Sequence, residues 1–74
     1  MFKQFDFLEV IEPFLIPVGK GRPVKGKIGD IFTVTSPTYN NKDFCLIDRK
    51  NKAKLNLGYR VNNADIQRFF KVIN

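Results

Sequence analysis

Lysine and arginine are the residues of this chain best placed to bind a ligand. Residues 20–54 hold nine of the thirteen Lys and Arg residues and only three acids. Cations displayed on a folded surface contact phosphate oxygens and release counterions, which favours a polyanionic partner. The formal net charge of +6 is concentrated in the middle of the chain, and it predicts binding to DNA or RNA, led by phosphate contacts and without sequence readout.

The basic residues fall in two segments. Residues 19–27 lack the Gly-x-x-x-x-Gly-Lys-Ser/Thr pattern of a phosphate loop, so they are interpreted as a flexible loop that follows a phosphate backbone or merely keeps the protein soluble. Residues 49–60 form the second segment. Tyr39, in a loop, is the preferred residue for stacking on a base, and Tyr59 is the lesser candidate because it shares an apolar face. The predicted nucleic-acid-binding residues are Lys20, Arg22, Lys25, Lys27, Tyr39, Arg49, Lys50, Lys52, Lys54 and Arg60.

The sequence carries no catalytic signature. It contains no histidine, the usual base near neutral pH and a common metal ligand. Cys45, in an apolar run, is expected to be a buried thiol and not a nucleophile. Asp43 and Asp48 bracket a strand at opposite ends and are not expected to act as a pair. We therefore expect a protein that is not an enzyme and that uses no cofactor and no metal.

Length and composition predict one domain over residues 1–74. Eight Phe and two Tyr supply a compact core, because each buried ring removes a large apolar area from water. The longest apolar stretch is interrupted by Pro13 and Pro17 and is too short to cross a membrane, and the N-terminus lacks the pattern of a signal peptide. We expect a cytoplasmic protein, of its own cell or of a host, that has no membrane partner and is a monomer or homodimer.

The local pattern favours strands over most of the chain. Residues 2–16 fit extended structure better than a helix, and the Gly- and Pro-rich residues 17–29 predict a long loop or an irregular hairpin. Residues 30–35 predict a strand that ends at Ser36-Pro37. Residues 44–47 predict a central strand that is covered on both faces, followed by a turn at 48–51.

Residues 52–61 carry the clearest period-two pattern in the chain. Apolar residues alternate with polar ones, which predicts a strand whose outer face displays Lys52, Lys54 and Arg60. The next segment, Asn62-Asn63, predicts a helix N-cap, and the i, i+3, i+4 spacing after it predicts one short helical turn packed on the core. Residues 72–73 are expected to form a brief closing strand. If the sheet curls, the basic strand face and the 20–27 loop are expected to share one surface.

This order of elements resembles the SH3-like small barrels, including the KOW-type domains of transcription and ribosomal proteins. The resemblance includes a Gly-Asp-x-φ-x-Val strand formed by Gly29, Asp30, Phe32 and Val34. It implies an all-β barrel of about five strands with one short C-terminal helical turn. KOW motifs continue into a glycine-rich turn, whereas residues 36–39 read Ser-Pro-Thr-Tyr, so no KOW binding residue is assigned. The size and the basic, Phe-rich composition are also similar to small accessory proteins of large bacteriophages.

Two functions follow from these patterns. The first is non-catalytic nucleic-acid binding. The alternative is a small protein-interaction module, or a phage-encoded inhibitor, that docks on an acidic surface of a host protein machine. Exposure of Phe2 and Phe5 would favour the alternative, because an exposed apolar patch indicates a protein partner.

Overall fold

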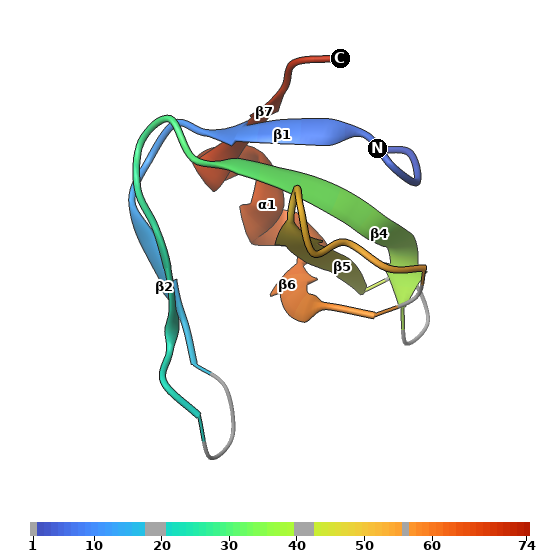
Figure 1. Cartoon of the computed structure of the whole chain (residues 1–74), viewed down its shortest axis with the longest axis horizontal. Coiled ribbons are helices and arrows are strands. Elements are labelled where there is room, and N and C mark those ends of the chain that lie inside the picture. The colour runs from blue at the N-terminus through green and yellow to red at the C-terminus, as the bar shows by residue number, and fades with distance from the viewer. Residues whose placement is uncertain (1, 18–20, 40–42, 56) are drawn as a thin grey trace.

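The computed structural model describes residues 2–17, 21–39, 43–55 and 57–74. Its chain is mostly strand with one short helix, so the all-β prediction is confirmed (Figure 1). In chain order the elements are β1 (Phe7–Val10), β2 (Phe14–Ile16), β3 (Val24–Gly26), β4 (Ile31–Tyr39), β5 (Phe44–Arg49), β6 (Tyr59–Asn62), α1 (Asn63–Phe69) and β7 (Phe70–Val72).

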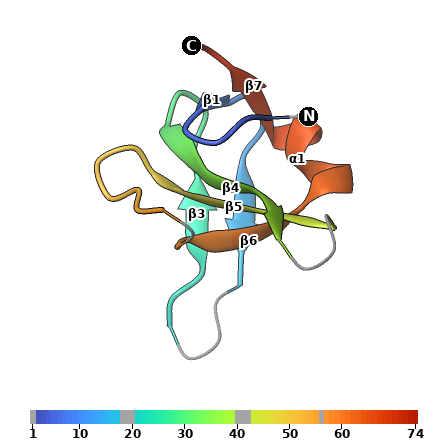
Figure 2. The same ribbon diagram turned by 90° about the vertical axis from the view of Figure 1, so that its right-hand side faces the viewer.

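The strands form two antiparallel sheets. The larger has five strands in the order β6-β5-β4-β1-β7, and the smaller is the β2–β3 hairpin. Figure 2 shows this hairpin running across the direction of β5 and β6. Among the described residues the strands do not close into a barrel, so the predicted barrel is not confirmed.

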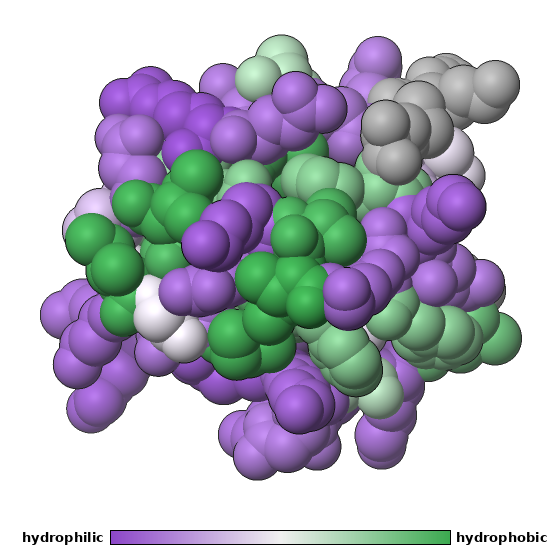
Figure 3. All heavy atoms as spheres, turned by 90° about the horizontal axis from the view of Figure 1, so that it is seen from above, coloured by the Kyte–Doolittle hydropathy of each residue, from purple (hydrophilic) through white to green (hydrophobic). Residues whose placement is uncertain are grey.

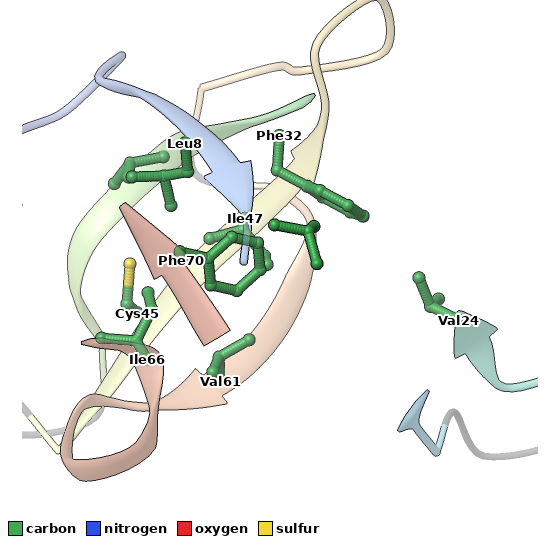
Figure 4. Close-up of a cluster of buried hydrophobic side chains, with 10 residues drawn as sticks. Leu8, Val24, Phe32, Cys45, Ile47, Val61, Ile66 and Phe70 are labelled. Atoms are coloured by element: carbon green, nitrogen blue, oxygen red, sulfur yellow. The ribbon is translucent and has the colours of Figure 1, made fainter. Parts of the chain in front are cut away.

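A single apolar core joins the large sheet to the hairpin and the helix. Side chains that alternate along β1 and β4, such as Leu8 and Val34, are fully buried on the inner face of the large sheet. Figure 4 shows Ile47 and Phe70 in the middle of this cluster, and Val24 on the hairpin strand at its side. Burial of these apolar side chains is the main stabilising term of the fold.

Phe14 holds the hairpin against this core. Its ring centroid lies 5.7 Å from that of Phe32, 5.6 Å from Phe69 and 5.0 Å from Phe70, in the tilted arrangements that aromatic rings prefer. Across the hairpin, Phe14 pairs with Gly26, where any Cβ would overlap the Phe14 ring. The absence of a Cβ at Gly26 therefore makes room for the Phe14 ring. The prediction of extended structure over residues 2–16 is confirmed only at β1 and β2, because residues 3–6 make a turn in which Asp6 N–H donates to Lys3 O (3.0 Å). A long loop or irregular hairpin was predicted for residues 17–29; residues 18–20 lie outside the described part, and residues 24–26 form β3, which pairs with β2.

β4 is longer than the sequence predicted. The strand was expected to end at Ser36-Pro37, but it continues to Tyr39, and this prediction is wrong. Its pairing with β5 changes register between Val34 and Ser36 and again between Ser36 and Tyr39. The hydrogen-bond ladder is interrupted at such irregularities, so a strand can contain a proline there although proline has no N–H to donate.

The prediction of a strand over residues 52–61 requires the largest correction. Only its end is a strand, β6, while the segment before it makes turns in which Lys52 N–H donates to Arg49 O (2.8 Å) and Leu57 N–H donates to Lys54 O (3.1 Å). Gly58 then has φ +144°, and a Cβ there would overlap the Ile47 carbonyl oxygen. The chain therefore approaches β5 only from Gly58 onward, and the residues before it lie outside the sheet.

The predicted N-cap is confirmed. The Asn62 side chain accepts a hydrogen bond from Ala64 N–H (2.8 Å), and α1 is seven residues long, longer than the single turn expected. Ile66 and Phe70 are buried. A closing strand is present, but β7 runs from Phe70 to Val72 and so begins two residues before the predicted 72–73; it pairs with β1.

Candidate nucleic-acid interface

A hollow of about 580 Å³ lies between the hairpin and the ends of β5 and β6. We call it the basic hollow. It contains three of the predicted cations, and its lining residues are Arg22, Pro23, Val24, Lys25, Arg49 and Tyr59. The first basic segment and Arg49, at the start of the second, therefore line one hollow, but the strand face that was expected to share this surface does not line it.

Arg49 is held in place by three contacts. Its Nη1 lies 3.7 Å from Asp30 Oδ2, its Nη2 donates to Lys25 O (3.1 Å), and its guanidinium carbon lies 5.1 Å from the Phe32 ring centroid. A guanidinium has five N–H donors, so these contacts leave donors for a phosphate. Arg49 is thus an oriented cation that also ties the hairpin to the sheet.

Arg22 and Lys25 contribute to the hollow in different ways. Arg22 is exposed immediately before β3, and within the described chain it has no ion pair or hydrogen bond. Along β3 the burial pattern places Lys25 on the opposite face of the strand from buried Val24 and Gly26. Lys25 is exposed and lines the hollow, and its carbonyl accepts the hydrogen bond from Arg49 Nη2.

Tyr59 is the aromatic residue of the basic hollow. It begins β6 opposite Ile47, is half-buried, and packs against the core while lining the hollow. The sequence ranked it below Tyr39, whose side chain lies outside the described residues, as does all of Lys20. Sequence patterning identified Tyr59 as a residue of an apolar face but gave no sign that β3 lies beside it.

The other predicted cations that the structure describes do not line the basic hollow. Lys27 is exposed, the Lys50 Nζ lies 5.1 Å from the Phe7 ring centroid, and Arg60 lies over the Phe44 ring at 4.8 Å. Arg60 also lines a separate hollow of about 400 Å³ beside β2 and α1.

Lys52 and Lys54 are exposed in the connection between β5 and β6. The predicted strand face of Lys52, Lys54 and Arg60 is therefore wrong, because only Arg60 is on a strand.

Apart from the pair between Arg49 and Asp30, the ion pairs of the described residues lie in a different part of the protein. Glu12 forms an ion pair with Arg68 (3.1 Å), and Glu9 with Lys71 (3.8 Å). These pairs join the first strands to the C-terminal elements. The excess of positive charge consequently remains with the hairpin and with the connection that follows β5.

Cys45 is 1% exposed, and the prediction of a buried thiol is confirmed. Burial raises its pKa to about 11, because an apolar surrounding disfavours the thiolate. The described residues include no group of three His, Cys, Asp or Glu side chains placed to hold a metal ion. None of the helices in the described chain is long and apolar enough to cross a membrane.

Comparisons of the chain with protein-family models, with curated proteins and with solved structures found no match.

Proposed function

We propose that this protein binds nucleic acid without catalysing a reaction, and that the basic hollow is its binding site. The observation that carries the proposal is the gathering of Arg22, Arg49 and Tyr59 in one hollow from three separate segments. Guanidinium groups match phosphate geometry, and a neighbouring aromatic ring adds a stacking surface. We place this activity in the cytoplasm, of its own cell or of a host.

Binding of this kind is directed at the backbone. Arg22 and Arg49 contact phosphates, Lys25 and Lys27 add attraction at the outside of the hairpin, and Tyr59 stacks on an unpaired base. Phosphate contacts position the ligand and carry no sequence information, so the binding is not sequence-selective.

We also propose kinship with the SH3-like small barrels. The support is the order of the elements, with a hairpin between the first and second strands of the large sheet and a helix before the last strand. α1 connects β6 directly to β7, so the two edge strands of the large sheet are joined by only seven residues. A short link of this kind suits a sheet that curls toward closure.

The first test is fluorescence anisotropy of labelled single-stranded DNA, duplex DNA and RNA over a salt series. Three to five phosphate contacts give a log–log salt slope of roughly −2 to −4.5, at about −0.7 per contact for single strands and about −0.9 for duplex. Arg22→Gln is expected to weaken binding to all three ligands and to make the slope less negative by about 1. Lys3→Gln is the matched control, because it removes one exposed charge far along the chain from the hollow. Absence of binding at low salt refutes the proposal.

Tyr59 provides a separate test of stacking. Tyr59→Leu is expected to weaken binding to single strands by about tenfold, since base stacking on an aromatic residue contributes about 1–3 kcal/mol. Duplex binding is expected to change less, and Tyr59→Phe is expected to restore single-strand affinity. Equal losses for single strands and duplex would remove Tyr59 from the binding site.

A second candidate function is docking on a host protein, and one observation favours it. Of the two phenylalanines whose exposure would favour this alternative, Phe5 is 53% exposed, whereas Phe2 packs against the core. Figure 3 shows apolar side chains gathered on one face of the molecule, and Ile73 N–H donates to Phe7 O (3.0 Å), which places two further exposed apolar residues side by side. Affinity capture from cell lysate with the native protein and with Phe5→Ser tests this surface: a partner lost with the variant supports it, and an unchanged set of captured proteins refutes it.

A further inference from the structure

The connection between β5 and β6 displays two leucines in solvent. Leu55 is 58% exposed and Leu57 is 59% exposed, although the sequence pattern placed both on the inner face of a strand. Single exposed apolar residues are common on protein surfaces. Two leucines two residues apart in a strongly basic segment are a more specific arrangement.

The structure fixes the position of this connection at both ends. Lys52 N–H donates to Arg49 O (2.8 Å) where the connection leaves β5, and Gly58 lies against the Ile47 carbonyl where it returns. Between these points the Leu57 N–H···O Lys54 hydrogen bond (3.1 Å) closes a tight turn. Figure 2 shows this yellow-to-orange connection projecting beyond the strands of the sheet.

The charged residues along the sequence of this connection have one sign. The sequence from 49 to 64 contains five cations and no acid. In the described part of the chain, Lys52 and Lys54 are exposed and form no ion pair. We call the group Lys52, Lys54, Leu55 and Leu57 the Leu–Lys loop. Its apolar side chains and its unpaired ammonium groups lie within six residues.

We propose that the Leu–Lys loop binds the surface of an anionic lipid bilayer. The leucines enter the boundary between headgroups and acyl chains, and the lysines remain at the level of the lipid phosphates. Anionic lipids attract each basic residue near their surface, and buried apolar area adds to this attraction. The protein would lie on the membrane and not span it.

The composition of the loop distinguishes a bilayer from the other polyanions. Nucleic acid offers phosphates but no apolar layer for Leu55 and Leu57, so those side chains would gain nothing there. A protein groove must match the shape of the loop, whereas a bilayer adapts to any projecting apolar turn. The bilayer is therefore the partner that uses both the leucines and the lysines.

The proposal does not depend on nucleic-acid binding, because the Leu–Lys loop and the lining of the basic hollow share no residue. The test is co-sedimentation of the full chain with phosphatidylcholine vesicles prepared with and without phosphatidylserine. We expect binding only to the anionic vesicles, weakened by salt. The variant Leu55→Ser/Leu57→Ser is expected to lose about tenfold or more in partitioning. Lys52→Gln/Lys54→Gln is expected to lose about fivefold for each lysine.

Leu15→Ser is the matched control, because Leu15 is also 58% exposed but lies on β2. It is expected to keep vesicle binding, and the double leucine variant is expected to keep its thermal unfolding midpoint and its DNA affinity. Failure of the native protein to bind anionic vesicles overturns the proposal. Equal losses for Leu15→Ser and for the loop variant also overturn it. If vesicle binding is absent and the loop variant instead loses a captured protein, the loop is a protein contact.

Discussion

Replacing Phe14 with leucine tests whether one ring holds the hairpin on the sheet. The side chain makes three aromatic contacts in the core but is itself only half-buried. Each aromatic pair contributes about 0.5–1.5 kcal/mol beyond area burial, and leucine retains much of the apolar contact. We therefore expect Phe14→Leu to lower the free energy of unfolding by about 2 kcal/mol.

This loss is large for a chain of this length. At roughly 0.05–0.15 kcal/mol per residue, the whole domain is stable by about 4–11 kcal/mol. A loss of 2 kcal/mol corresponds to a fall of roughly 8–16 °C in the thermal midpoint. Urea unfolding and thermal melts followed by circular dichroism measure both quantities. Leu15→Ala is the control: it alters the neighbouring exposed side chain and is expected to change stability by at most about 0.5 kcal/mol.

Phe14→Leu also tests whether the position of the hairpin affects binding at the proposed site. A loosened hairpin moves Arg22 relative to Arg49, so Phe14→Leu is expected to weaken DNA binding even though residue 14 does not line the basic hollow. Native stability in Phe14→Leu would refute the role assigned to the ring. A large loss of stability with unchanged DNA affinity, measured where the variant is fully folded, would show that the hairpin does not position the site.

Three further substitutions or reactions test individual features. Gly58→Ala is expected to destabilise the fold by about 1–3 kcal/mol in urea unfolding, because φ +144° strains any residue with a Cβ and the added atom meets the Ile47 carbonyl; an unchanged midpoint would contradict the close approach. Asn62→Ala is expected to cost about 1 kcal/mol through loss of the cap on Ala64 N–H, and Asn62→Asp, which retains an acceptor, is expected to cost less. Cys45, with its pKa raised to about 11, is expected to resist a thiol reagent at pH 8 in the native protein and to react in urea; rapid native labelling would contradict its burial.

The elements set by local chemistry were predictable from the sequence. The helix N-cap requires only that the Asn62 side-chain oxygen accept a hydrogen bond from the N–H two residues later. The strand β5 is indicated by a run of apolar residues, which is typical of a strand that is buried on both faces. Both signals lie within a few neighbouring residues. The end of β4 was missed because pairing with β5 carries the strand past Pro37, and that pairing is not visible locally.

The segment around Leu55 and Leu57 shows where patterning fails. Alternation of apolar and polar residues records which side chains would share a face if the backbone were extended. It does not record whether the backbone is extended. Because of the turn closed by the Lys54 carbonyl and the conformation of Gly58, the strand begins only at Tyr59. Leu55 and Leu57, which the pattern placed in the core, are therefore exposed to solvent.

The candidate site was predictable as a list of cations but not as an arrangement. Arg22, Arg49 and Tyr59 meet only because the hairpin crosses the sheet, and this crossing depends on aromatic contacts between distant segments. No spacing in the sequence encodes it.

Arg49 shows how closely the basic hollow is coupled to the fold. Its ion pair with Asp30, its hydrogen bond to Lys25 O and its position over Phe32 join the hairpin to the large sheet. Removing Arg49 would therefore change the shape of the hollow together with its charge, and a loss of binding in that variant would not separate the two causes. Arg22 is free of such contacts in the described chain, so its substitution reports the phosphate interaction itself.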